Sequence, residues 1–133
     1  SDEYADAVCR AIKALGGDLF LLMPPELGRA AAGAGIRFVP EGYVDLDYDA
    51  AGKLVLERVK QLRDPAAMAE RSVRLITEHV VPTVEGGLLD LTVSSICVHG
   101  DAPNATDIAR AIRAALAAAS VEVVPLSKLG EGT

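Results

Sequence analysis

The sequence predicts an α/β protein built from parallel-strand βα units. Short apolar runs rich in β-branched residues, typical of buried strands, alternate with longer segments whose apolar residues recur at helical spacing. The stretch at 94–119 shows one unit complete, with a strand, a polar turn after Gly100 and an alanine-rich helix. This alternation favours a parallel sheet with right-handed crossovers.

The first part of the chain carries clear strand and helix boundaries. A run of apolar residues that leaves no polar face predicts an interior strand of a parallel sheet. Gly16 and Gly17 end the first helix, and Pro24-Pro25 stops the strand and opens the next helix. The expected elements are a helix at 2–15, a strand at 19–23, a helix at 27–34, and a strand at 36–39 with Pro40-Glu41-Gly42 after its carboxyl end.

An acidic, aromatic segment at 43–48 follows, and it is expected to be a solvated loop. Asp45, Asp47 and Asp49 alternate there, but the segment lacks the glycine and glutamate positions of a calcium-binding EF-hand loop. The basic residues of 58–63 are likewise interpreted as a solvated edge.

The second part of the chain begins with a helix signal. Asp64 suits the N-cap and Pro65 the first helical position. Asn104 suits the N-cap of the alanine-rich helix. The expected elements are a helix from Pro65 to about Glu78, a hairpin or an irregular excursion within 80–92, the strand and helix of 94–119, and a last strand at 121–124.

A period of two along the strand before Gly100 places Ser95, Cys97 and His99 on one face. Sites in α/β proteins lie beyond the carboxyl ends of parallel strands, where His99 and Asp101 stand. The residues alone leave two interpretations open. His99 and Asp101 belong to a functional site, or His99 is a core histidine with its hydrogen bonds satisfied and Asp101 is a turn residue.

Composition limits the classes of function. The chain has 133 residues, half of them hydrophobic, and a net charge of −6, which argues against nucleic acid or an anionic membrane as partner. Cys9 and Cys97 form no motif, which predicts two reduced thiols and no metal site. No composition shift marks a boundary, so residues 1–133 are expected to form a single unit.

Three segments together resemble the LamB/YcsF (lactam utilisation) family, to which the A subunit of 5-oxoprolinase belongs. They are residues 41–48 with Gly52-Lys53-Leu54-Val55 behind them, the hexapeptide Ile96-Cys97-Val98-His99-Gly100-Asp101, and Asp101-Ala102-Pro103-Asn104-Ala105 running into the helix. The hexapeptide is the most specific, since it follows the family pattern without a change. The resemblance covers about residues 4–125 and corresponds to the carboxyl-terminal half of a family member.

This resemblance implies a fold, an activity and partners. The fold is part of a (β/α) barrel of the glycoside hydrolase/deacetylase type. The activity is ATP-dependent hydrolysis of the lactam 5-oxoproline to L-glutamate, carried out in the cytoplasm with partner subunits B and C. The catalytic residues carried over are His99 and Asp101 from the hexapeptide, and Glu41 and Asp45 from the first segment.

Departures from the family pattern keep other functions open. Leu46 stands where the family has arginine, and the amino-terminal motifs of the family are absent. A non-catalytic binding or assembly module derived from the family is therefore the alternative, and an unrelated small-molecule-binding α/β domain is a third. A barrel of eight units takes about 250 residues, so half of one exposes two sheet edges. A missing amino-terminal half, a second copy of the chain, or rearrangement into a compact open sheet would remove this exposure. We expect the isolated chain to associate as a homo-oligomer.

Overall fold

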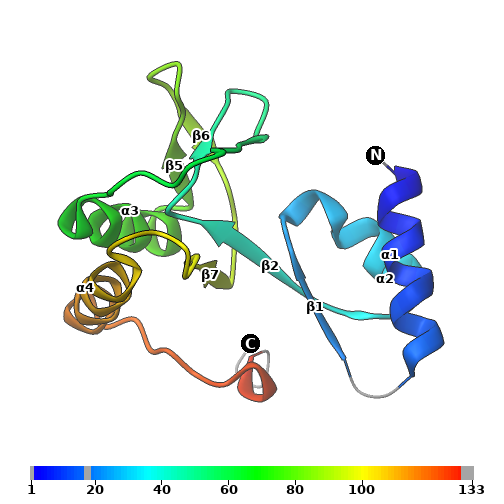
Figure 1. The fold of residues 1–133 in the computed structure, drawn as a ribbon. Helices are drawn as coiled ribbons and strands as arrows, with labels where there is room; N and C mark the ends of the chain where they lie inside the picture. Colours follow the sequence, from blue (N-terminus) through cyan, green and yellow to red (C-terminus); the bar gives the residue numbers. More distant parts are fainter. Residues whose placement is uncertain (1, 17–18, 130–133) are drawn as a thin grey trace.

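A computed structural model describes residues 2–16 and 19–129. Its first part pairs two helices with two strands (Figure 1). Helix α1 ends at Leu15, as the sequence predicts, and Gly16 takes a left-handed φ of 67°. Gly17 lies outside the described residues. The elements are α1 (Asp2–Leu15), β1 (Phe20–Met23), a 3-10 turn η1 (Pro25–Leu27), α2 (Gly28–Ala34) and β2 (Arg37–Tyr43).

The second part adds two helices, one more parallel strand and two small antiparallel pairs. Asp64 caps α3 as predicted, because its carboxylate accepts a hydrogen bond of 3.0 Å from the Ala66 amide. The hairpin expected within 80–92 is confirmed as β5 paired with β6. The elements are β3 (Asp47–Tyr48), β4 (Leu54–Val55), α3 (Pro65–Thr77), β5 (Val80–Pro82), β6 (Leu88–Asp90), β7 (Ser95–Cys97), α4 (Ala105–Ala118) and a 3-10 turn η2 (Leu126–Lys128).

The principal sheet is parallel, in the order β1-β2-β7. The prediction of a mixed α/β fold with parallel strands is confirmed. The interior position predicted for the 19–23 strand is wrong, because within the described residues β1 pairs with β2 alone. The central strand is β2 instead, because it pairs with β1 on one side and with β7, which follows much later in the chain, on the other. Three strands make an open sheet, so the barrel stays an expectation.

Strand β2 runs further than the sequence predicts. Pro40, Glu41 and Gly42 lie within it, and not after its end. The proline is tolerated because Met23, its partner on β1, is the last residue of that strand. Gly42 is required for packing, since a Cβ there would lie 2.6 Å from Leu75 Cδ2 on α3. This close approach of backbone to helix lets β2 continue to the site.

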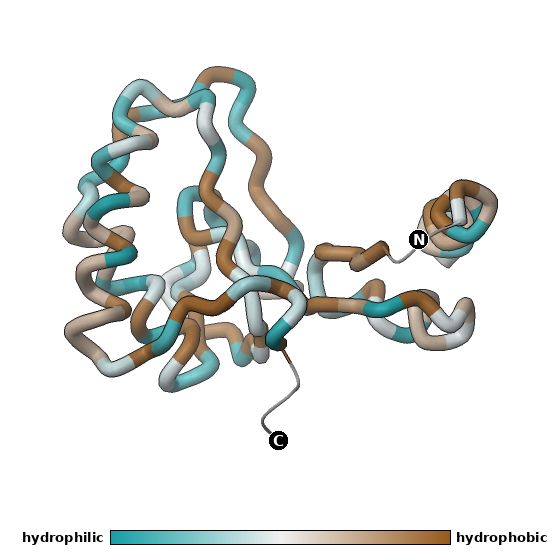
Figure 2. The backbone as a smooth tube through the Cα atoms, turned by 90° about the horizontal axis from the view of Figure 1, so that it is seen from below, coloured by the Kyte–Doolittle hydropathy of each residue, from teal (hydrophilic) through white to brown (hydrophobic). Residues whose placement is uncertain are grey.

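The buried side chains form two clusters, one at each end of β2. The smaller joins Cys9 of α1, Leu21 of β1 and Ala31 of α2. The larger lies where α3 and α4 pack together beside the sheet. Figure 2 shows apolar stretches along the backbone in the parts of the chain that hold the two clusters. The larger cluster holds Val44, Tyr48, Met68, Leu75, Val81, Val93, Ile108, Ile112 and Leu116.

Two expectations about the carboxyl-terminal part are corrected. Residues 121–124 are not a strand, because they find no partner strand among the described residues. They run past an open trough of about 440 Å³ lined by apolar side chains of β7, α4 and this segment. Asn104 occupies the N-cap position, but its side chain does not cap α4. Its Nδ2 instead donates a hydrogen bond of 2.7 Å to the Arg63 carbonyl.

Among the described helices, none has the length and apolar character that crossing a membrane requires.

Candidate active site

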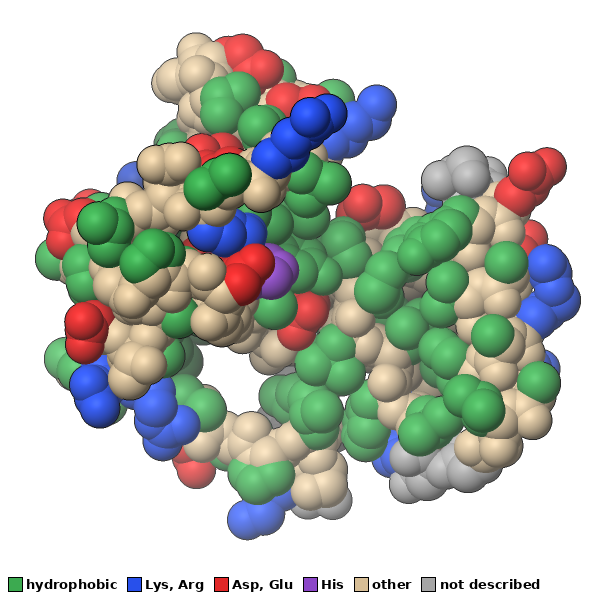
Figure 3. All heavy atoms as spheres, in the orientation of Figure 1, with side chains coloured by type: hydrophobic (Ala, Val, Ile, Leu, Met, Phe, Trp, Pro, Cys, Tyr) green, Lys and Arg blue, Asp and Glu red, His purple; other side chains and the backbone are tan. Residues whose placement is uncertain are grey.

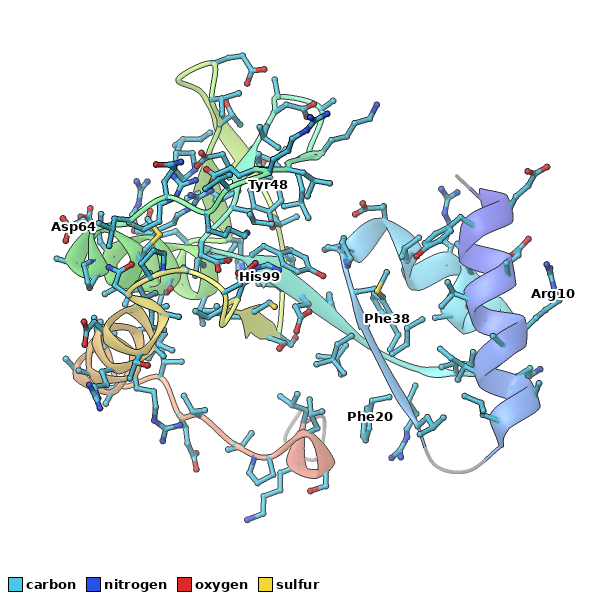
Figure 4. The ribbon with its side chains drawn as sticks, viewed as in Figure 1. Arg10, Phe20, Phe38, Tyr48, Asp64 and His99 are labelled. Carbon is cyan, nitrogen blue, oxygen red and sulfur yellow. The ribbon has the colours of Figure 1, made fainter. Side chains whose placement is uncertain are left out.

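Two parallel strands deliver Asp45 and His99 to the same place. In the β2–β7 register Glu41 is opposite Ser95 and Tyr43 is opposite Cys97. Asp45 and His99 stand two residues beyond Tyr43 and Cys97, just past the ends of the two strands, and the hydrogen bonds between them show that they lie together. The site therefore forms where the carboxyl ends of β2 and β7 meet, the usual position in α/β proteins. Figure 4 shows the labelled His99 beside the end of β2.

Asp45 holds His99 through both backbone and side chain. The His99 amide donates a hydrogen bond of 2.7 Å to Asp45 Oδ2. The ring atom Nδ1 lies 3.0 Å from each carboxylate oxygen. The Asp45 side chain is 2% exposed and that of His99 is 34% exposed. A buried acid thus orients a ring that remains accessible to solvent.

This contact selects the protonation pattern of the ring. An ionised carboxylate only accepts hydrogen bonds, so Nδ1 carries the proton in the neutral ring. Nε2 then holds the free lone pair, and it makes no hydrogen bond within the described part of the chain. The arrangement suits a ring that takes up and returns a proton at Nε2. The interpretation of His99 as a satisfied core histidine does not account for that free nitrogen.

Two tyrosines support the pair. The Tyr43 ring stacks on the His99 ring, with centroids 6.0 Å apart and planes 24° from parallel. The Tyr43 amide donates a hydrogen bond of 2.9 Å to the Tyr48 hydroxyl. Burial and the charge of Glu41 raise the pKa of Tyr43. Burial also raises the pKa of Tyr48, against the hydrogen bond from Tyr43, so both phenols stay neutral far above neutral pH.

Glu41 lies two residues before Tyr43, on the same face of β2. Its Oε2 accepts a hydrogen bond of 3.2 Å from the Ser95 hydroxyl. Burial, then the charges of Glu41 and Asp45, raise the pKa of the neighbouring Cys97 thiol, while Lys60 opposes them. Glu41 therefore belongs to the same surroundings as Asp45 and His99, and adds a second acidic group to them.

Asp101 is placed differently from the other three predicted site residues. It is exposed in the turn that precedes α4, and its carboxylate makes no hydrogen bond or ion pair with the described residues. The structure therefore brings together Asp45 and His99, with Glu41 nearby, and leaves Asp101 apart. Catalytic roles for all four remain predictions.

The segment 43–48 is not the solvated loop expected from its acidic composition. Val44, Asp45, Leu46 and Tyr48 are all buried. Asp47 is bonded to two guanidinium groups, with Arg63 Nη2 at 3.1 Å and Arg71 Nη1 at 3.3 Å. The expectation fails because long-range arginine partners neutralise the carboxylate and allow the segment to pack inward.

The basic stretch is also not merely a solvated edge. Arg63 is four-fifths buried and pairs with Glu57 as well as Asp47.

Sequence reasoning missed Arg71 and the two tyrosines as parts of the site. Only the alternation of acidic and aromatic residues at 43–48 hinted at them. Figure 3 shows histidine, acidic and basic side chains gathered on one face of the molecule.

The described residues contain no group of three histidine, cysteine or carboxylate side chains able to hold a metal ion. Glu41 and Asp45 are the acidic groups at the pair, whereas the Asp47 carboxylate is paired with Arg63 and Arg71. Acidic side chains repel a triphosphate, and no glycine-rich phosphate loop occurs in the sequence. The residues of this chain therefore do not by themselves fit ATP.

Known proteins share this arrangement of segments. The chain is 42% identical over 126 residues to the A subunit of 5-oxoprolinase from Kocuria rhizophila, covering 92% of this chain and 50% of that protein. It is 43% identical over 124 residues to the Nocardia farcinica protein of the same name, covering 91% and 50%. The lactam utilization protein of Thermus thermophilus superposes with a TM-score of 0.78 at 33% identity, covering 92% and 50%.

These likenesses agree with the resemblance seen in the sequence motifs. The chain spans about half the length of the relatives it matches. The sequence profile of the LamB/YcsF family matches residues 1–131. The chain therefore belongs to the LamB/YcsF family.

Proposed function

We propose that this chain forms one side of the pocket of a 5-oxoprolinase, which opens the lactam 5-oxoproline to L-glutamate at the expense of ATP. The observation that carries the proposal is the Asp45–His99 pair at the joined carboxyl ends of β2 and β7. Relatives named as the A subunit of 5-oxoprolinase support the choice of substrate. That designation also supports partner subunits B and C, and we place the assembly in the cytoplasm.

Hydrolysis of a lactam needs a base for the attacking water and an acid for the departing nitrogen. His99 Nε2 accepts a proton from water as the water oxygen bonds to the lactam carbonyl carbon. The imidazolium then gives that proton to the lactam nitrogen as the carbon–nitrogen bond of the lactam breaks, leaving a free carboxylate and amine. Asp45 stabilises the positive imidazolium and keeps its ring in place.

ATP supplies activation of the amide carbonyl when the assembled enzyme binds it. Because the acidic residues around the pair do not fit a triphosphate, we assign its binding to the partner subunits. What this chain contributes is the proton transfer at Nε2 and the orientation of the ring.

The open sheet indicates that other polypeptide completes the pocket. Within the described residues β1 and β7 each have a free edge, and the trough beside β7 leaves apolar side chains uncovered. Closure into a barrel by an amino-terminal half, or cover by a second copy of the chain, would bury both features. The twofold greater length of the relatives supports such a completion.

The test is a chimera in which this chain replaces the matching half of the Kocuria rhizophila relative. With partner subunits B and C and ATP, we expect it to convert 5-oxoproline to glutamate. His99→Ala should lower turnover by about 100-fold or more, because proton transfer by a positioned side chain contributes that much. His79→Ala is the matched control, since His79 is exposed at the end of α3. A folded chimera without turnover, or equal effects of the two variants, would refute the proposal.

A further inference from the structure

Arg71 is a buried cation that the proposed chemistry does not use. It lies in α3 with 8% of its surface exposed. Nη1 lies 3.3 Å from Asp47 Oδ1, and the guanidinium carbon lies 5.9 Å from the centre of the Tyr48 ring. Nε and Nη2 are buried without a hydrogen-bond partner among the described residues. Arg71 thus makes one direct ion pair and one ring contact while leaving two donors unsatisfied.

This arrangement is costly if stability is its purpose. Buried donors without partners carry a desolvation penalty, and a well-packed apolar side chain of similar size often stabilises such a position better. Asp47 also does not depend on Arg71 for neutralisation, because Arg63 Nη2 lies 3.1 Å from its other oxygen. The contacts that Arg71 makes therefore point to a role in placing its neighbours.

Those neighbours hold the segment that carries Asp45. Asp47 and Tyr48 follow Asp45 by two and three residues. The Tyr48 hydroxyl accepts the hydrogen bond from the Tyr43 amide, two residues before Asp45. Contacts with Asp47 and Tyr48 thus hold one end of the segment 43–48 directly and the other end through Tyr48.

We propose that Arg71 is a positioning residue that holds the segment 43–48 so that Asp45 keeps both contacts with His99 and imposes the Nδ1–H form of the ring. The importance of Arg71 for turnover rests on the proposed function, but its effect on the contacts between Asp45 and His99 does not. The expected readout is therefore the tautomer of His99, which nuclear magnetic resonance reports from the ring nitrogen shifts without any substrate.

The test compares Arg71→Met with Arg74→Met in the chain labelled with nitrogen-15. Methionine fills the site without the charge, and Arg63 remains to pair with Asp47. Arg74 is on the same helix but more exposed, and pairs with Glu78 at 3.1 Å. We expect Arg71→Met to lower the Nδ1–H fraction of His99 by about twofold with little change in the urea midpoint. Arg74→Met should leave the ring unchanged.

Two results would overturn the proposal. One is a folded Arg71→Met chain whose His99 tautomer matches the original. The other is a loss of tautomer that occurs only together with a large fall in the urea midpoint, which would make Arg71 a general stabilising residue. Should Arg71→Met not fold, Arg71→Lys decides. Lysine keeps the charge but lacks the planar fork, so a partial loss of the Nδ1–H form is expected and an unchanged tautomer refutes the role. Because none of these measurements needs turnover, they are independent of the chimera assay.

Discussion

Asp45 accepts two kinds of hydrogen bond from one residue, the backbone amide of His99 at 2.7 Å and its ring Nδ1 at 3.0 Å. The two residues lie 54 positions apart in the sequence and meet because β2 and β7 are neighbours. The backbone bond fixes where the histidine stands, and the ring bond fixes how it is turned. A buried carboxylate is suited to this task, since few other partners compete for it.

Replacing Asp45 tests whether this orientation matters for catalysis. Asp45→Asn keeps the size of the side chain and an acceptor for the His99 amide, but its NH₂ group favours the opposite ring tautomer. We expect lactam turnover by the chimera to fall by about 100-fold or more while the fold persists. Asp90→Asn, at an exposed position on β6, is the control and should retain full turnover. Equal turnover by both variants would show that Asp45 does not position the ring.

Gly42 offers a test of the packing that carries β2 to the site. A Cβ at this position would lie 2.6 Å from Leu75 Cδ2 and 3.4 Å from Val93. We expect Gly42→Ala to lower the free energy of unfolding by ~1–3 kcal/mol, the usual cost of overpacking a core. Urea denaturation followed by circular dichroism measures this change.

The matched control is Gly33 in α2, where an added Cβ meets nothing within 4 Å. Gly33→Ala should raise the free energy of unfolding by ~0.5–1 kcal/mol, because alanine loses less backbone entropy in a helix. Stabilisation by both substitutions would mean that β2 and α3 are not packed as closely as described.

These relationships show what a sequence reveals about such a site. The strand at Ser95–Cys97 and the period of two were sufficient to place His99 on a strand end. The hexapeptide also suggested Asp101 as its neighbour, but the turn after Gly100 leaves that carboxylate exposed and without a partner among the described residues. Nearness in sequence is a poor guide to contact where the chain turns.

The partners that do reach the site come from distant segments. In the sequence Arg71 looks like an ordinary polar residue of an amphipathic helix, and only tertiary packing brings it into contact with Asp47. The residues 121–124 fail for the converse reason. Their β-branched composition favours a strand, but a strand also needs a neighbour with free backbone groups in register. Local pattern therefore predicted element types well and spatial partners poorly.

The pKa of the Cys97 thiol depends on the charges around the Asp45–His99 pair. Burial, Glu41 and Asp45 raise the pKa of its thiol, against the effect of Lys60, so less of the reactive thiolate exists at pH 8. Removing one negative charge should lower that pKa. We expect Glu41→Gln to speed alkylation by iodoacetamide about two- to fivefold in a Cys9→Ser background. Glu78→Gln, on an exposed residue at the end of α3, should leave the rate unchanged. A slower reaction of Glu41→Gln would reverse the assigned sign.

The raised pKa of Tyr43 predicts that the folded chain loses stability at alkaline pH. Burial and Glu41 raise its pKa in the folded chain, so the phenol ionises more readily once the chain unfolds. The stability contribution is complete below the ordinary tyrosine pKa, about 10, and declines as pH rises above it. We therefore expect the urea midpoint to fall between pH 8 and pH 11.

Tyr43→Phe should show a smaller fall over the same range, with the remainder due to Tyr48, whose pKa is also raised. Tyr4→Phe is the control, because Tyr4 is 60% exposed and should not alter the pH dependence. Identical falls in the original chain and Tyr43→Phe would exclude Tyr43 as a source of the effect.

The free edge of β7 and its trough predict that the isolated chain associates. Val121 and Val123 line the trough together with Ile96 and Val98, and Val123 is 53% exposed. Burying this apolar surface against a second copy is favourable, whereas a charge there would have to be desolvated. We expect light scattering to give about twice the 13.9 kDa mass of one chain, and Val123→Asp to weaken association by about tenfold. Val84→Asp, on an equally exposed valine outside the trough, should leave the mass unchanged. A monomer at high micromolar concentration, or equal weakening by both variants, would show that this surface does not mediate self-association.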